Sequence, residues 1–106
     1  MRFGPWYPLA DAGDHTPPAE NVVQVRLAHG LLDYPRGKSA MLWYAHAHDV
    51  RAEALALADM HAGEDLLCRH LIEIEPGADL GTFCAKLRQD FVRRFGTRPR
   101  YETSSE

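Results

Sequence analysis

The strongest constraint on the fold is an apolar pattern of helical spacing near the end of the chain. Apolar residues occupy positions i, i+3, i+4, i+7 and i+11 of one segment, namely Leu80, Phe83, Cys84, Leu87 and Phe91. This spacing predicts a helix with one apolar face. Asp79 is placed to cap its first turn, Gly96 to end it, and Pro99 to prevent it from resuming. Such a face must be buried against another layer.

Three segments have the composition of β-strands, and they are residues 21–30, 40–45 and 65–77. The first carries three valines, the second reads AMLWYA, and the third is apolar with polar interruptions and ends at a Pro-Gly pair. Residues 31–39 are expected to connect the first two without a regular element, because Pro35 and Gly37 disfavour one. We therefore expect a hairpin with a long loop.

A second helix is predicted over about residues 49–62. Val50, Ala54, Leu57 and His61 recur at helical spacing, and Leu55, Ala58 and Met60 widen the apolar face. Asp49 is the expected N-cap, since its carboxylate can accept from the free N–H groups of the first turn. Gly63 is the expected stop.

Together these elements predict an α+β domain with a small three-stranded sheet, two main helices and the order β-β-α-β-α. Residues 1–20 are rich in Pro, Gly and Asp and are expected to form an irregular arm. The domain is expected to span residues 21–101, followed by a flexible tail over 102–106.

Composition limits the class of protein. The chain has 106 residues, of which 45% are hydrophobic and 25% charged, as in a single globular domain. No apolar run approaches the roughly 20 residues of a membrane span, and the N-terminus lacks a secretory signal. Two cysteines, Cys68 and Cys84, are too few for a disulfide scaffold, so we expect buried thiols and a cytoplasmic location. No pattern marks either as an activated nucleophile.

The net charge is −3, but the cations are unevenly distributed. Six of them lie near the end of the chain: Lys86, Arg88, Arg93, Arg94, Arg98 and Arg100. They predict a local basic face that could bind nucleic acid. The alternative is a solvated helix whose basic end suits the helix dipole. Arg36 and Lys38, in the loop PRGKS, could likewise meet a phosphate or be solvated.

The junction after the second strand holds His46, His48 and Asp49. Two histidines one residue apart on an extended segment point to the same side, as in some metal sites. His61 lies too far along the helix to join them, and two histidines with an N-cap aspartate make an incomplete zinc site. Metal binding is therefore the weaker expectation. The stronger one is that the two histidine rings are hydrogen-bonded to backbone groups.

The order of elements and several short strings resemble the GIY-YIG nuclease fold. The strings are PPAENVVQVR at residues 17–26, WYAHAHDVRAE at 43–53 and FVRRFGTRP at 91–99. The resemblance implies a site built from two tyrosines, an arginine on the first helix and a glutamate on a later helix, with a divalent metal. It covers most of the chain, but each string is short.

The departures from that family concern its catalytic positions. The first signature tyrosine falls on Val23, the second on Trp43 with Tyr44 beside it, the glycine on Ala45 and the arginine on Glu53. No glutamate occurs over residues 79–95. Valine cannot transfer protons, and a carboxylate repels phosphate. The resemblance therefore implies a domain without this catalytic machinery.

We accordingly expect a catalytically impaired GIY-YIG-like domain that binds nucleic acid or protein and needs no cofactor. The candidate nucleic-acid contacts are Arg36, Lys38, Arg51, Lys86, Arg93, Arg94 and Arg98. The negative net charge slightly favours a protein partner, for which Trp43, Tyr44 or Tyr34 would be anchors. The sequence leaves the oligomeric state open.

The alternative function is a divergent metal-dependent nuclease with a rebuilt site. Its catalytic candidates are Tyr44, His46, His48 and Arg51, and its metal candidates are His46, His48 and Asp49. These side chains offer general-base and metal-ligand chemistry within one short stretch. A divalent metal would be required only under this alternative.

Overall fold

A computed structural model describes residues 1–102 of the chain. Its elements are β1 (Arg2–Phe3), β2 (Tyr7–Pro8), a 3-10 turn η1 (Leu9–Asp11), α1 (Ala12–His15), β3 (Asn21–Leu27), β4 (Leu32–Tyr34), β5 (Gly37–Ser39), β6 (Met41–Ala47), α2 (Val50–Met60), β7 (Leu66–Glu73) and α3 (Leu80–Phe95). The α+β class is confirmed. The expected order is present in β3, β6, α2, β7 and α3, but further elements are inserted and added.

The main sheet has five strands, so the expected three-stranded sheet is wrong in number. Strand β3 lies in the middle with β6 and β7 antiparallel on its two sides, and both β1 and β2 pair with β7. The two extra strands and helix α1 come from residues 1–20, which were expected to be irregular. A two-residue strand carries no periodicity, so its pairing depends on contacts distant in sequence, such as Tyr7 opposite Cys68.

Residues 31–39 form a second, two-stranded hairpin of β4 and β5 where no regular element was expected. Tyr34 pairs with Gly37, which leaves Pro35 and Arg36 as a two-residue turn. Proline fits a turn because its ring fixes φ, and Gly37 has φ of 151°, which other residues rarely adopt. Pro35 and Gly37, which were expected to disfavour a regular element, lie in the turn and at the start of β5.

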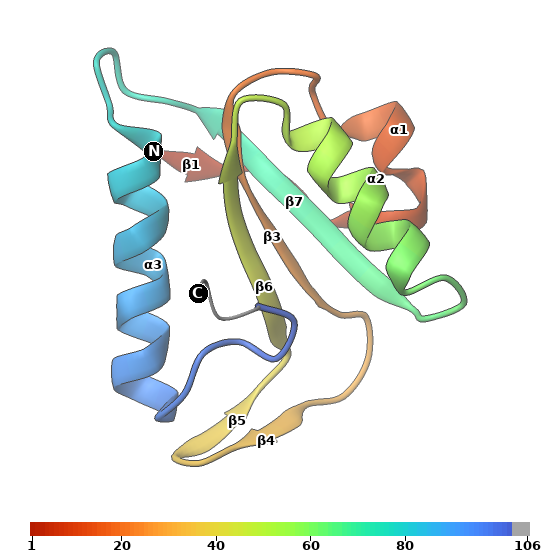
Figure 1. Cartoon of the computed structure of the whole chain (residues 1–106), viewed down its shortest axis with the longest axis vertical. Coiled ribbons are helices and arrows are strands. Elements are labelled where there is room, and N and C mark those ends of the chain that lie inside the picture. The colour runs from red at the N-terminus through yellow and green to blue at the C-terminus, as the bar shows by residue number, and fades with distance from the viewer. Residues whose placement is uncertain (103–106) are drawn as a thin grey trace.

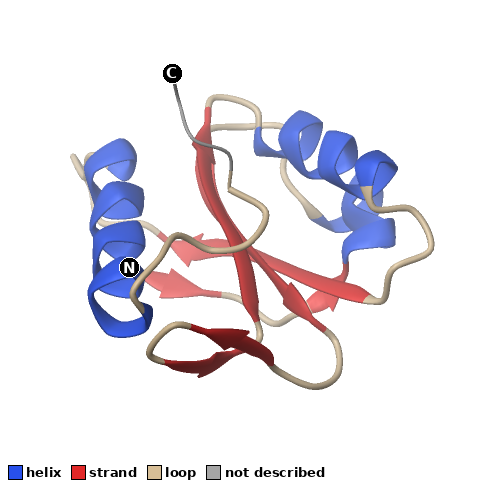
Figure 2. Ribbon diagram, turned by 60° about the horizontal axis from the view of Figure 1, so that its bottom comes forward, coloured by secondary structure: helices blue, strands red, loops and turns tan. Residues whose placement is uncertain are grey.

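Helices cover both faces of the main sheet, with α1 and α2 on one side and α3 on the other (Figures 1 and 2). Val23 and Val25 pack in the core beneath α2, whereas Val22 packs in the core beneath α3. Because β3 is covered on both faces, its first five residues are all buried. This burial explains its nearly continuous apolar sequence.

Three of the four expected helix ends follow their capping residues, whereas α2 ends at Met60 with His61, and not Gly63, as its C-cap. Asp49 accepts a hydrogen bond from the backbone N–H of Ala52 at 3.2 Å, and Asp79 accepts one from Thr82 at 3.0 Å. Gly96 ends α3 in the left-handed conformation, with φ of 86°. These three local predictions are confirmed.

Both cysteines are free and buried, as expected. Burial raises the pKa of the Cys68 thiol to about 11 and also raises the pKa of Cys84 above its ordinary value. Neither thiol is therefore activated as a thiolate at neutral pH. In the part of the chain that the structure describes, no helix is long and apolar enough to cross a membrane.

Candidate functional site: a basic groove beside helix α3

The segment after α3 returns to the sheet and lies along the outer edge of β6 (Figure 1). The backbone N–H of Tyr101 donates to the carbonyl of Leu42 at 2.9 Å. An edge strand offers unpaired backbone groups, and a covering segment satisfies some of them. The last described residue, Glu102, is thereby placed between β6 and α3.

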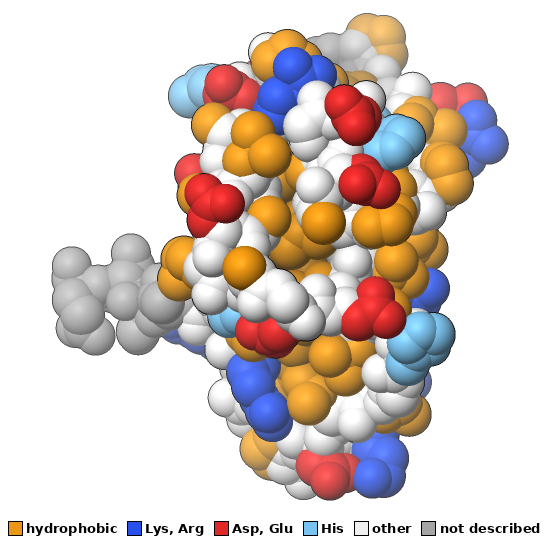
Figure 3. Space-filling model, turned by 90° about the vertical axis from the view of Figure 1, so that its right-hand side faces the viewer, with side chains coloured by type: hydrophobic (Ala, Val, Ile, Leu, Met, Phe, Trp, Pro, Cys, Tyr) orange, Lys and Arg blue, Asp and Glu red, His pale blue; other side chains and the backbone are white. Residues whose placement is uncertain are grey.

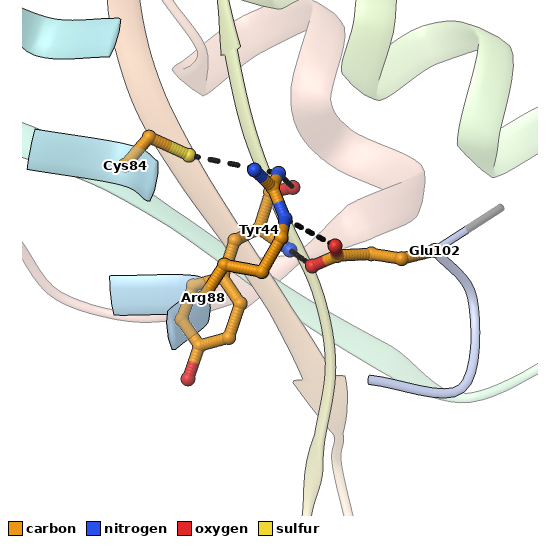
Figure 4. Close-up of polar contacts among 4 residues, drawn as sticks. All are labelled: Tyr44, Cys84, Arg88 and Glu102. Atoms are coloured by element: carbon orange, nitrogen blue, oxygen red, sulfur yellow. Dashed lines mark hydrogen bonds and ion pairs between the residues drawn. The ribbon is translucent and has the colours of Figure 1, made fainter. Parts of the chain in front are cut away.

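The side chain of Glu102 is held in a buried polar cluster with Tyr44, Cys84 and Arg88, which we call the Glu102 cluster (Figure 4). One carboxylate oxygen accepts a hydrogen bond from Nε of Arg88, and the other accepts one from the backbone N–H of Tyr44 at 3.2 Å. Arg88 also donates to the Tyr44 carbonyl at 3.0 Å. The Glu102 side chain is only 7% exposed. The expected tail thus begins with an anchored residue, and residues 103–106 lie outside the described part.

Burial determines the protonation behaviour of this cluster. It raises the pKa of Glu102 above its ordinary value, although Arg88 and the Tyr44 amide oppose the shift. Burial and then the nearby Glu102 raise the pKa of Tyr44 to about 12. The phenol of Tyr44 points away from the Arg88–Glu102 pair (Figure 4), and its ring packs edge-on against Phe91. Tyr44 contributes its backbone to the cluster, whereas its hydroxyl is not among the atoms gathered there.

The raised pKa of Glu102 gives a pH prediction for the variant Glu102→Gln. The folded protein binds this proton more tightly than the unfolded chain, so Glu102 makes folding less favourable as pH rises from its ordinary value of 4.5 through its folded pKa. Urea denaturation between acidic and neutral pH is expected to show wild-type stability falling relative to the variant over that window. Parallel curves would contradict the raised pKa.

Three cavities adjoin one another around α3 and the C-terminal segment, and Arg98 borders all of them. Their volumes are about 680, 360 and 430 Å³. The largest lies against Tyr34 and Arg100, the second against Trp43 and Arg88, and the third against Arg93. We call this continuous surface the Arg98 groove.

The structure brings four of the nucleic-acid candidates to one place, the C-terminal end of α3. Arg36 reaches across from the β4–β5 turn and donates to the carbonyl of Arg93 at 2.8 Å. Arg93 is 76% exposed and lies 3.1 Å from Asp90, and the Arg94 guanidinium lies 5.3 Å from the Phe95 ring centroid. Cations at this end are favoured by the helix dipole. Arg98 follows in the loop after the helix.

The other nucleic-acid candidates lie apart from this group. Lys86 is exposed but sits nearer the middle of α3. Lys38, on β5, is ion-paired with Asp33 at 2.5 Å. Arg51, on α2, donates from Nε to the carbonyl of Thr16 at 2.7 Å and so ties α2 to the N-terminal segment.

Two of the three junction residues, Asp49 and His46, make polar contacts within the fold, whereas His48 makes a ring contact. Asp49 caps α2, and Nε2 of His46 lies 2.7 Å from a carboxylate oxygen of Glu20. The rings of His46 and His48 are edge to face, with centroids 6.1 Å apart. Among residues 1–102, no three His, Cys, Asp or Glu side chains are grouped so that they could hold a metal ion. The geometry therefore adds no support for a metal site here.

The positions matched to the GIY-YIG signature converge on the second cavity. Trp43, Tyr44, Ala45 and Glu53 all line it, whereas Val23 is buried in the core beneath α2. Its charged lining is completed by Arg88, Arg98 and Glu102, with His46 also present. This cavity can bind polar or anionic groups through arginine.

The opposite face of the molecule has a different character. Viewed from the α2 side, carboxylates are scattered among patches of apolar surface, and most Lys and Arg lie toward the edges (Figure 3). Leu55 and Met60 of α2 are among the exposed apolar residues. Of the cations that predicted a basic face, Lys86, Arg88, Arg93 and Arg94 lie on α3.

The sequence did not single out the two charged residues at the centre of the site. Arg88 follows Cys84 by one helical turn, a spacing that puts it on the margin of the apolar face and could have indicated its inward position. Glu102 has no pattern that could have indicated burial. No family model, curated protein sequence or solved structure matches this chain.

Proposed function

We propose that this chain is a GIY-YIG-like domain that binds single-stranded nucleic acid, without cleaving it, through the Arg98 groove. The observation that carries the proposal is the convergence of arginines from three separate segments at the C-terminal end of α3. Arg93, from α3, and Arg98, from the following loop, border the groove, whereas Arg36, from the β4–β5 turn, and Arg94, from α3, lie beside them at the helix end. This local concentration of positive charge suits a polyanion although the whole chain carries a net charge of −3.

The shape and lining of the groove favour a single strand. Proteins that bind single strands combine a cationic groove that follows the phosphates with aromatic rings on which bases stack. Here Tyr34 lines the largest cavity together with two arginines, and Trp43 lines the second together with two arginines. The carboxylates in these walls are Asp33, Glu53 and Glu102. Trp43 is partly exposed and can accept a stacked base, whereas Tyr34 is 8% exposed and shapes the wall.

The chemistry of the matched positions supports binding without cleavage. Glu53 replaces the arginine of the resemblance, and Tyr44 directs its phenol away from the charged pair. Glu102 contacts the matched strand through its carboxylate, but the two oxygens are engaged by Arg88 and the Tyr44 amide. These features support binding over hydrolysis.

The test is fluorescence anisotropy of labelled single-stranded DNA and RNA, titrated with the protein at several salt concentrations. Arg93→Ala is expected to weaken binding roughly fivefold at about 0.1 M salt and to reduce the salt slope by about 0.7, the contribution of one single-strand phosphate contact. Arg98→Ala is expected to do the same.

Arg2→Ala is the matched control, because Arg2 is also an exposed arginine paired with one carboxylate, Glu73 at 2.9 Å, but lies on β1 at the far edge of the sheet. It should leave binding unchanged. Binding that does not depend on salt, or an equal loss in Arg2→Ala and Arg93→Ala, would remove the groove from the proposal. Tighter binding of duplex than of single strands would contradict the single-strand assignment.

A further inference from the structure

A second cationic site lies on the part of the sheet face beside α3 and outside the Arg98 groove. The guanidinium carbons of Arg26 and Arg69 lie 4.3 and 4.4 Å from the ring centroid of Trp6. Arg69 is also 4.8 Å from the Phe3 ring. Neither arginine borders any of the three cavities of the groove.

Strand register explains why these two arginines meet. Gln24 on β3 pairs with Arg69 on β7, and two residues along β3, Arg26 pairs with Leu67. Arg26 and Arg69 are therefore diagonal neighbours on the same face of adjacent strands. Trp6, from the segment between β1 and β2, lies against both of them.

The charge of the pair is not balanced within the described chain. Among residues 1–102, the only hydrogen bond from either guanidinium is from Nε of Arg69 to the side-chain oxygen of Gln24, at 2.6 Å. Neither is ion-paired with a carboxylate among residues 1–102. Nε of Arg26 is buried without a hydrogen-bond partner in that part of the chain.

The unbalanced charge and the unpaired Nε–H each destabilise the folded chain. Two neighbouring guanidinium groups repel each other, and burial together with Arg26 lowers the pKa of Arg69 below its ordinary value. A buried N–H without an acceptor is also unfavourable. An oxyanion supplies several acceptors, and guanidinium groups match its geometry with paired hydrogen bonds.

We propose that Arg26 and Arg69 form a binding site for an oxyanion, a phosphate or carboxylate group that bridges their guanidinium groups beside Trp6. The indole ring holds both cations in place by cation–π contact. Gln24 fixes Arg69 through its Nε, so the terminal nitrogens of Arg69 remain as donors for the ligand. The site is independent of the nucleic-acid groove.

Trp6 itself provides the probe. The chain has two tryptophans, so the substitution Trp43→Phe leaves Trp6 as the only indole. In this background, fluorescence is recorded while inorganic phosphate or acetate replaces chloride at constant ionic strength. A saturable change is expected, and the anion that produces it at lower concentration identifies phosphate or carboxylate as the preferred class.

The variants separate an anion site from a structural stack. Arg26→Gln is expected to weaken anion binding roughly tenfold, the effect of losing one charged hydrogen bond. Arg26→Lys keeps the charge but lacks the planar guanidinium. Its affinity for the anion should therefore lie between those of Arg26→Gln and wild type. Arg2→Gln, with the same loss of charge on β1, should bind as wild type does.

Circular dichroism establishes whether each variant is folded. If Arg26→Gln does not fold, Arg26→Lys provides the test in its place. The absence of a saturable response to either anion would overturn the proposal and leave the stack as a means of fixing the N-terminal segment. An equal response in Arg26→Gln and wild type would overturn it as well.

Discussion

Replacing Phe91 with alanine is expected to lower the free energy of unfolding by about 3–5 kcal/mol, which is the usual cost of removing a buried phenylalanine ring. Phe91 is only 4% exposed. Its ring is edge-on to Tyr34, with centroids 5.0 Å apart, and lies 4.6 Å from the Phe95 centroid. The ring therefore joins α3 to the β4–β5 hairpin and to Tyr44 on the sheet. Urea denaturation of wild type and variant measures the loss.

The matched control is Leu55→Ala, an apolar truncation on α2 at a residue that is 39% exposed. It should change the free energy of unfolding by no more than about 0.5–1 kcal/mol, because less apolar surface is removed from the interior. A loss below about 1 kcal/mol for Phe91→Ala would show that α3 is not fastened to the sheet through this ring. The total free energy of unfolding of a domain of this size is only about 5–15 kcal/mol, so the expected loss is a large fraction of it.

Replacing Arg88 with leucine is expected to lower the free energy of unfolding by about 1–3 kcal/mol at neutral pH, because it leaves the Glu102 carboxylate buried without its cation. The Arg88 side chain is 35% exposed, so the attraction itself is partly screened by water. Most of the effect is the cost of desolvating Glu102, whose side chain is 7% exposed. The measurement is again urea denaturation.

A double substitution separates this cost from the loss of packing by Arg88. Arg88→Leu combined with Glu102→Gln removes both charges, so the pair of changes should be less destabilising than the sum of the single changes. Strict additivity would mean that Glu102 is not held by Arg88. The comparison uses four proteins, namely wild type, Arg88→Leu, Glu102→Gln and the double variant.

The sequence predicted the elements whose signals are local. The boundaries of α3 follow from Asp79, a helical apolar face and Gly96, all of which act within a few residues. The pairing of β3 with β6 also agrees with the expected hairpin. The strands of the N-terminal arm were missed because Tyr7 and Pro8 pair with β7, about 60 residues away, and only the folded context fixes that pairing.

The hairpin of β4 and β5 was missed for a different reason. Pro35 and Gly37 were interpreted as breakers of regular structure, whereas they occupy a two-residue turn and the first residue of the following strand. Both residue types break long strands and also make tight turns, so the same pattern supports either outcome. The two strands have only three residues each, so they fit on either side of such a turn.

The candidate site was predictable in its residue types and not in its geometry. The crowding of arginines after residue 86 is visible in the sequence. Arg36 joins them only because the β4–β5 hairpin lies against α3, where its N–H donates to the carbonyl of Phe95. The buried position of Glu102 depends on the return of the chain to β6, a tertiary contact without a local signal.

The most direct test of the Arg98 groove is two-dimensional NMR of the ¹⁵N-labelled protein, titrated with a short single-stranded oligonucleotide. Binding in the groove is expected to shift the Trp43 indole N–H and the amides of Arg93, Arg98 and Arg100, with little change elsewhere. Shifts confined to the exposed apolar end of β7 around Ile72, or no shifts at low salt, would contradict it.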